Sequence, residues 1–91
     1  MATIAVILKI DGESVVHALR QASEKLDAAN GQLVLDFSAV SRIDAAALAA
    51  MEEFAGVADS RGVKLALRGV NIEVYKVLKL AKLAPRFSFL S

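Results

Sequence analysis

Several residue types that carry chemistry are absent or rare in this sequence of 91 residues, which has no cysteine, no tryptophan and one histidine. Without cysteine, the chain has no disulfide, no thiolate nucleophile and no cysteine ligand for zinc. The single histidine, His17, has no second imidazole with which to form a multi-histidine metal site. Its place in a helical pattern predicts an exposed side chain rather than a catalytic one. We therefore expect neither a metal ion nor a catalytic histidine.

Glycine is also sparse, and the five glycines stand singly along the chain. Isolated glycines form neither a dinucleotide fingerprint nor a phosphate-binding loop. No uninterrupted apolar run approaches the roughly 18–20 residues that span a bilayer. Residues 1–10 lack the basic lead of a signal peptide. We expect a cytoplasmic protein without a cofactor and without direct membrane insertion.

The charges nearly cancel, with 11 basic residues, 10 acidic residues and a net charge of +1. No overall field favours nucleic acid, and we expect no nucleic-acid partner. Hydrophobic residues make up 56% of the chain, which indicates a sheet buried on both faces. Because a chain this short cannot divide its core, residues 1–91 are expected to form one domain.

Apolar runs typical of strands alternate with helical patterns along the chain. Strands are predicted at residues 3–10, 32–37, 63–67 and 86–90, and helices at residues 14–29, 44–62 and 71–85. Connections that contain a helix favour parallel pairing of the strands that they join. The sequence therefore predicts an α/β fold, a mostly parallel or mixed four-stranded sheet packed with three helices.

Polar residues mark the expected starts of these helices. Ser14, Asp44 and Asn71 stand where a side chain accepts a hydrogen bond from an amide of the first helical turn. Gly62 stands where a residue in the left-handed conformation ends a helix. The second helix, from Asp44 to Gly62, is therefore the best-defined element.

Two carboxylates, Asp36 and Asp44, follow the second strand at the end of the sheet where ligands usually bind in α/β proteins. A paired-carboxylate site is one interpretation. However, the helix cap accounts for Asp44, and no lysine or histidine is fixed nearby to shift either pKa. We therefore expect a protein that is not an enzyme.

Three lysines, Lys76, Lys79 and Lys82, recur at every third position of the last predicted helix, beside Glu73. A solvated helix face accounts for this spacing. The alternative is a docking strip for an acidic partner or for lipid headgroups.

The most informative segment is LVLDFSAVSRIDAAAL, at residues 33–48. It consists of an apolar strand that ends in aspartate, a short loop, and an Ile-Asp pair before three alanines and a leucine. This arrangement resembles the signature of STAS domains. The resemblance covers residues 4–90, of which 33–67 are the most specific, and it implies a sheet with helices packed against it. The family's first hairpin strand and its C-terminal helix have no counterpart in this sequence.

In anti-sigma factor antagonists of this family, the helix after the Ile-Asp pair presents a serine to a kinase-like anti-sigma factor. The resemblance places that serine at Ala46, which has no hydroxyl group. The implied partner-binding residues are Ser41, Asp44, Ala45, Ala46 and Ala47. The candidate phosphorylation sites in the preceding loop are Ser38 and Ser41.

The resemblance implies a non-enzymatic bacterial module that binds a kinase-like anti-sigma factor or a related regulatory protein. The alternative is a STAS subunit of a bacterial phospholipid-transport ABC complex, bound to the ABC-transporter ATPase. The strand at 3–10 is expected at an edge of the sheet, and the tail ends with Phe87, Phe89 and Leu90. Since exposed edges and apolar ends favour pairing, we also predict some assembly into a homo-oligomer.

Overall fold

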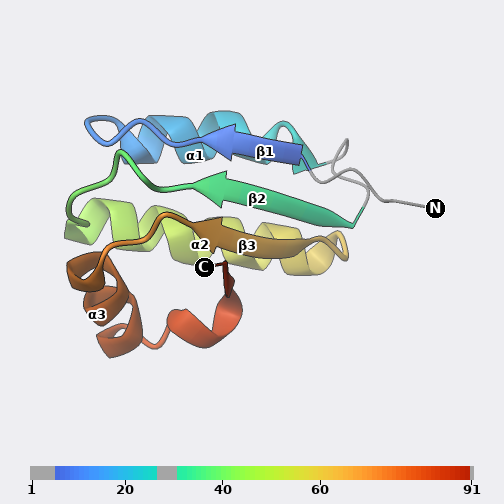
Figure 1. Cartoon of the computed structure of the whole chain (residues 1–91). Helices are drawn as coiled ribbons and strands as arrows, with labels where there is room; N and C mark the ends of the chain where they lie inside the picture. The colour runs from blue at the N-terminus through green and yellow to red at the C-terminus, as the bar shows by residue number, and fades with distance from the viewer. Residues whose placement is uncertain (1–5, 27–30, 91) are drawn as a thin grey trace.

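A computed structural model of the chain describes residues 6–26 and 31–90 (Figure 1). Its elements in chain order are β1 (Val6–Lys9), α1 (Val15–Ser23), β2 (Gln32–Asp36), α2 (Ala45–Ser60), β3 (Lys64–Arg68), α3 (Ile72–Leu80), the 3-10 helix η2 (Ala84–Arg86) and β4 (Ser88–Leu90). Predictions that fall on residues 3–5 and 27–30 lie outside the described residues.

The strands form one parallel sheet in the order β1-β2-β3-β4. Each strand pairs with the next one in the chain. The pairing is parallel because the connection between each two strands returns the chain to the end of the sheet at which the first strand began. The register aligns Ile7 with Val34, Val34 with Ala66, and Ala66 with Ser88. The predicted α/β fold, with a parallel four-stranded sheet and three helices, is confirmed.

The hydrophobic core lies between one face of the sheet and the helices. Figure 1 shows α1 and α2 behind the strands, on the same side of the sheet. Leu35 of β2 and Leu67 of β3 are fully buried in this core, together with Met51 of α2. Each such side chain contributes about 1.5–3 kcal/mol through its removal from water. The other buried helix residues in the core include Leu19, Phe54, Val74 and Leu78.

The opposite face of the sheet is buried at its centre and open at the strand ends. Val34 and Ala66 alternate with the core leucines along β2 and β3, and both are buried. Gln32, Lys64 and Arg68 lie on the same face and are exposed. The prediction of two buried faces therefore holds at the centres of β2 and β3. It does not hold at the strand ends or in β1, where Ile7 on this face is 49% exposed.

The first helix is shorter than predicted. α1 ends at Ser23, and the next two amides, of Glu24 and Lys25, donate to carbonyls three residues earlier, at 3.2 and 2.9 Å. Such bonds tighten the last turn of a helix and end it. Ser14 occupies the N-cap position, but its side chain accepts no capping hydrogen bond, so that part of the prediction was wrong.

The last helix is also shorter than predicted. α3 ends at Leu80, and the amide of Leu83 donates to the carbonyl of Leu78 at 2.9 Å across its end. Lys82 has a φ of 62°, the left-handed conformation that closes this kind of helix terminus. Lys82 therefore lies beyond α3, and Pro85 belongs to the separate helix η2.

The outer strands of the described sheet are β1 and β4, as expected for the first strand. In the C-terminal tail, Phe87 is buried in the core, whereas Leu90 is exposed. The predicted self-association stays a prediction.

Candidate protein-binding site

The loop between β2 and α2, residues 37–44, is held between the two neighbouring loops. A Cβ atom at Gly12, in the loop after β1, would overlap the carbonyl oxygen of Ala39. A Cβ atom at Gly69, in the loop after β3, would lie 2.9 Å from Cβ of Ser38. Because only glycine allows both approaches, the loop that leads into α2 is fixed from both sides.

Asn71 adds a polar connection between this loop and α3. Its side-chain oxygen accepts a hydrogen bond from the amide of Val74 at 2.8 Å, which is the predicted helix cap. Its side-chain nitrogen donates to the carbonyl oxygens of Val40 at 3.3 Å and Ser41 at 3.0 Å. One side chain therefore caps α3 and fastens the loop that carries Ser41, a second role that its position in the sequence does not indicate.

The start of α2 carries most of the predicted partner-binding residues. Asp44 caps the helix by accepting a hydrogen bond from the amide of Ala47 at 2.8 Å, which confirms the predicted cap. Asp44, Ala45 and Ala46 are exposed. Ala47 is only 4% exposed, and its methyl group faces the core. The surface at this helix start is therefore formed by Asp44 and two small side chains, with Ser41 exposed in the preceding loop.

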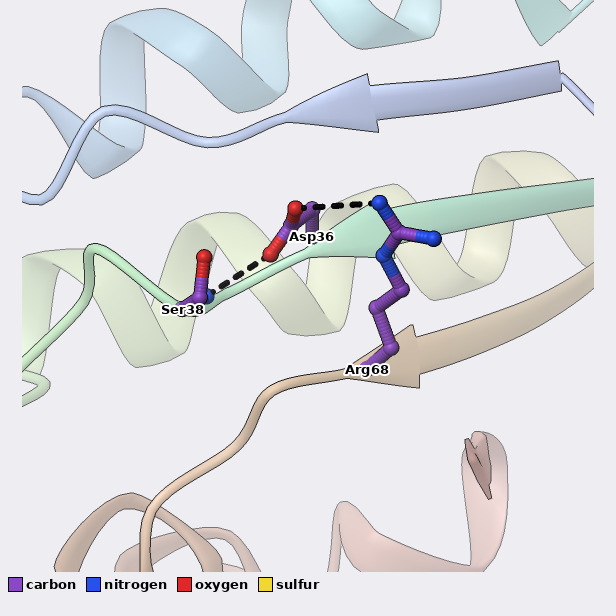
Figure 2. A network of polar contacts seen from close by, with 3 residues as sticks. All are labelled: Asp36, Ser38 and Arg68. Atoms are coloured by element: carbon purple, nitrogen blue, oxygen red, sulfur yellow. Dashed lines mark hydrogen bonds and ion pairs between the residues drawn. The ribbon is translucent and has the colours of Figure 1, made fainter. Parts of the chain in front are cut away.

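Asp36 belongs to a different set of contacts from Asp44. Figure 2 shows the side chains of Asp36 and Arg68 pointing toward one another from β2 and β3. They form an ion pair at 3.3 Å, and the backbone amide of Ser38 donates to the other carboxylate oxygen at 2.9 Å. The amide and hydroxyl of Ser38, together with Arg68, hold the pKa of Asp36 below its ordinary value.

These contacts argue against the paired-carboxylate interpretation. Each of the two acids already accepts from groups of its own, Asp36 from Ser38 and Arg68, and Asp44 from the first turn of α2. Arg68 was not predicted as part of this site. The signal was available once the strands were paired in register, because Asp36 and Arg68 are then direct cross-strand neighbours of opposite charge.

The two candidate phosphorylation sites are both exposed but differ in their surroundings. Ser38 lies beside the Asp36 carboxylate and against the backbone of Gly69. At Ser41 the backbone carbonyl is held by Asn71. A phosphate on Ser38 would stand next to the Asp36 carboxylate, which is unfavourable, and near the Arg68 guanidinium that pairs with it, which is favourable. Phosphorylation at either residue stays a prediction.

A shallow groove between α1 and α2 opens onto the start of α2. Val16 and Arg20 of α1 line it along its length, and Ala46 and Ala47 contribute from α2. Arg42 lines the end of the groove nearest the loop. These α1 residues were not predicted from the sequence, because only the packing of α1 on α2 brings them beside the start of α2.

Within residues 6–26 and 31–90, no group of three or more histidine, aspartate or glutamate side chains is arranged to hold a metal ion. In the same part of the chain, no helix has both the length and the apolar character needed to cross a membrane.

The family model for the STAS domain matches residues 2–90 of the sequence. The chain belongs to the STAS domain family. This STAS domain therefore has the sheet with packed helices that the resemblance at residues 33–48 implied. No curated protein sequence matches it significantly.

Several solved structures share the fold. The crystal structure of TM1081, a candidate anti-sigma factor antagonist of Thermotoga maritima, superposes with a TM-score of 0.74 at 22% identity, covering 93% of this STAS domain and 77% of that chain. The NMR structure of TM1081 gives a TM-score of 0.78 at 22% identity, covering 100% and 77%. The unphosphorylated form of the anti-sigma factor antagonist SpoIIAA gives 0.72 at 14% identity, covering 100% and 84%. At these identities, the superpositions establish the fold.

Proposed function

We propose that this STAS domain is a non-enzymatic regulatory module of the anti-sigma factor antagonist type, and that it binds its partner without phosphorylation at residue 46. The observation that carries the proposal is the exposed surface at the start of α2, where Ala46 is the second helical residue. Family membership supports a regulatory protein-binding role. The proposed partner is a kinase-like anti-sigma factor or a related regulatory protein in the cytoplasm.

The chemistry of residue 46 gives the proposal its direction. A phosphoserine at this position would add about −1.5 to −2 charges at a helix start where Asp44 already presents a carboxylate. Alanine has no hydroxyl group, so this means of releasing a partner does not exist at residue 46. Since Ala45 and Ala46 are small, a partner surface can approach the backbone of the first turn closely.

The groove beside the helix start extends the proposed contact surface toward α1. Arg20 and Arg42 place two guanidinium groups at the groove, and Glu13 and Glu53 place two carboxylates there. The methyl groups of Ala46 and Ala49 make part of its lining apolar. Arginine is enriched at protein interfaces because its planar group pairs with carboxylates and stacks on other planar groups. We include Arg20 and Arg42 with Ser41, Asp44, Ala45 and Ala46 in the proposed surface.

Identification of the partner tests the function class. Affinity capture from the native host followed by mass spectrometry is expected to recover an ATPase of the histidine-kinase type. Recovery of an ABC-transporter ATPase would instead place the chain in a phospholipid-transport complex, the alternative role. When the captured kinase is incubated with this chain and ATP, residue 46 should stay unmodified. A phosphopeptide that contains Ser38 or Ser41 would show that phosphorylation of the loop regulates binding instead.

The substitution Ala46→Asp tests the surface itself. The added carboxylate is expected to weaken the captured partner's affinity by about tenfold or more, equivalent to about 1.4 kcal/mol. The fold should be retained, because a carboxylate near a helix N-terminus is neutral to stabilising. Isothermal titration with the purified partner measures the affinity, and thermal unfolding measures the stability.

Two control variants separate the causes. Ala46→Asn adds nearly the same volume without a charge, so a smaller loss than in Ala46→Asp would identify charge as the cause. Ser60→Asp makes the same change in net charge at the exposed opposite end of α2, and it should leave the affinity unchanged. Equal affinity of wild-type and Ala46→Asp protein would refute the proposed surface.

A further inference from the structure

The outward side of α3 presents large apolar side chains to solvent. Ile72 is 70% exposed and Leu80 is 85% exposed, and Tyr75 is also exposed. Lys76 and Lys79 are exposed on the same side of the helix. We call these five residues the α3 face. Exposed apolar side chains that form one contiguous patch mark candidate interaction surfaces.

The lysines of the α3 face have no carboxylate partner among residues 6–26 and 31–90. Among the described residues, no ion pair involves Lys76 or Lys79. Lys82, the third lysine of the predicted series, lies just past the end of α3 and adds a third positive charge nearby. Glu73 is the single acidic residue of the helix. The α3 face is therefore positively charged as well as apolar.

The order of residues around the helix indicates what kind of partner fits. At 100° per residue, Lys79 falls between Tyr75 and Ile72, and Lys76 falls between Ile72 and Leu80. A helix that lies in a membrane surface has one continuous apolar arc, with its lysines at the edges. Here the two lysines interrupt the apolar arc, so seating Ile72 and Leu80 in hydrocarbon would force both lysine side chains to bend back toward the headgroups. An acidic protein segment is the better match.

A hollow beside the α3 face provides a place for an apolar side chain. It is lined by Ile72 and Tyr75 of α3, by Phe89 and Leu90 of β4, and by the loop before α3. Tyr75 meets Phe89 edge to face with ring centroids 5.1 Å apart, which fixes one wall. A partner that pairs carboxylates with the two lysines can place an apolar group here.

We propose that the α3 face is a second protein-binding surface, and that it binds an acidic amphipathic segment in which two carboxylates lie between large apolar side chains. The carboxylates pair with Lys76 and Lys79, which are neighbours one turn apart, and the apolar side chains contact Ile72, Leu80 and the hollow. This surface uses none of the residues proposed for partner binding at the start of α2.

The test uses two labelled helical peptides, one with two glutamates between leucines and one with glutamines in their place. Fluorescence anisotropy with the full chain should show about tenfold or stronger binding of the glutamate peptide. The double substitution Lys76→Gln/Lys79→Gln should abolish the preference, whereas Lys76→Arg/Lys79→Arg should keep it. Ile72→Ser/Leu80→Ser should weaken the binding of both peptides. Since all four side chains are exposed, these variants are expected to fold, and circular dichroism verifies this.

Control measurements distinguish the proposal from its competitors. Lys64→Gln, at an exposed lysine of β3, should leave the preference for the glutamate peptide intact. Equal affinity for both peptides in the wild-type chain would overturn the proposal. A second result would also overturn it: the chain sediments with vesicles of equal parts phosphatidylglycerol and phosphatidylcholine, this sedimentation depends on the two lysines, and neither peptide is preferred. That result would identify lipid as the ligand. Ala46→Asp should leave peptide binding unchanged, so this test is independent of the proposed function.

Discussion

The helices α2 and α3 begin and end in the same way but expose chemically different side chains. Each begins with a side chain that accepts a hydrogen bond from the amide three residues later, at 2.8 Å. Each ends with a residue in the left-handed conformation, Gly62 after α2 and Lys82 after α3. Yet α2 exposes small side chains at its start, whereas α3 exposes isoleucine, leucine and lysine. Helix signals therefore fix where a helix begins and ends, and they do not fix what it binds.

The largest expected effect on the free energy of unfolding comes from replacing a buried apolar residue of α2, compared with an exposed apolar residue of α3. Phe54 of α2 is buried in the core, and Ile72 of α3 is exposed. Phe54→Ala should lower the free energy of unfolding by about 3–5 kcal/mol, through lost burial and the cavity left behind. Ile72→Ala should change it by no more than about 0.5 kcal/mol. Urea denaturation measures both, and a large loss for Ile72→Ala would show that the α3 face contributes to the core.

The two helix-capping residues should contribute different amounts to the free energy of unfolding. Asp44→Ala removes one capping bond and should cost about 1 kcal/mol. Asn71→Ala removes a cap and also the bonds to the carbonyls of Val40 and Ser41, and should cost about 2 kcal/mol. Asn71→Ser keeps an oxygen that can cap the helix and lacks the two donated bonds, so it should fall between wild type and Asn71→Ala. Equal costs for both alanine variants in chemical denaturation would mean that the loop contact contributes nothing.

The smallest expected effect concerns the helix ends. A side chain in the left-handed conformation costs about 1–2 kcal/mol, which Gly62 avoids and Lys82 does not. Gly62→Ala should therefore destabilise the chain by about 1 kcal/mol. Lys82→Gly should stabilise it by about 0.5 kcal/mol, because the greater freedom of glycine in the unfolded chain offsets part of the gain. Lys82→Ala is the control for loss of the charge and should match wild type in thermal unfolding; a destabilised Lys82→Gly variant would contradict this account.

Much of the fold and part of the candidate site followed from local patterns. The caps at Asp44 and Asn71 and the left-handed Gly62 were predicted because each depends on bonds between residues only a few positions apart. The early ends of α1 and α3 were missed, since apolar spacing continues past both termini. At Lys82 a non-glycine residue adopts a conformation for which glycine is the usual signal.

The features missed at the site all join distant parts of the chain. The Asp36–Arg68 ion pair spans 32 positions, and Asn71 donates to carbonyls 30 and 31 positions earlier. Arg20 reaches the proposed surface only because α1 packs beside α2. A single sequence contains these partners without indicating their pairing, because strand register and helix packing bring them together.

The sequence by itself determined the alternation of strands and helices, the STAS signature at residues 33–48, and the alanine at position 46. These depend on residue type and on spacing over one or two helical turns, which a linear pattern contains in full. The tertiary structure decided that Ala47 is buried while Ala46 is exposed, and that the side chains of Ile72 and Leu80 remain in solvent. Exposure depends on which neighbours a packed side chain meets, and those neighbours come from other elements of the fold.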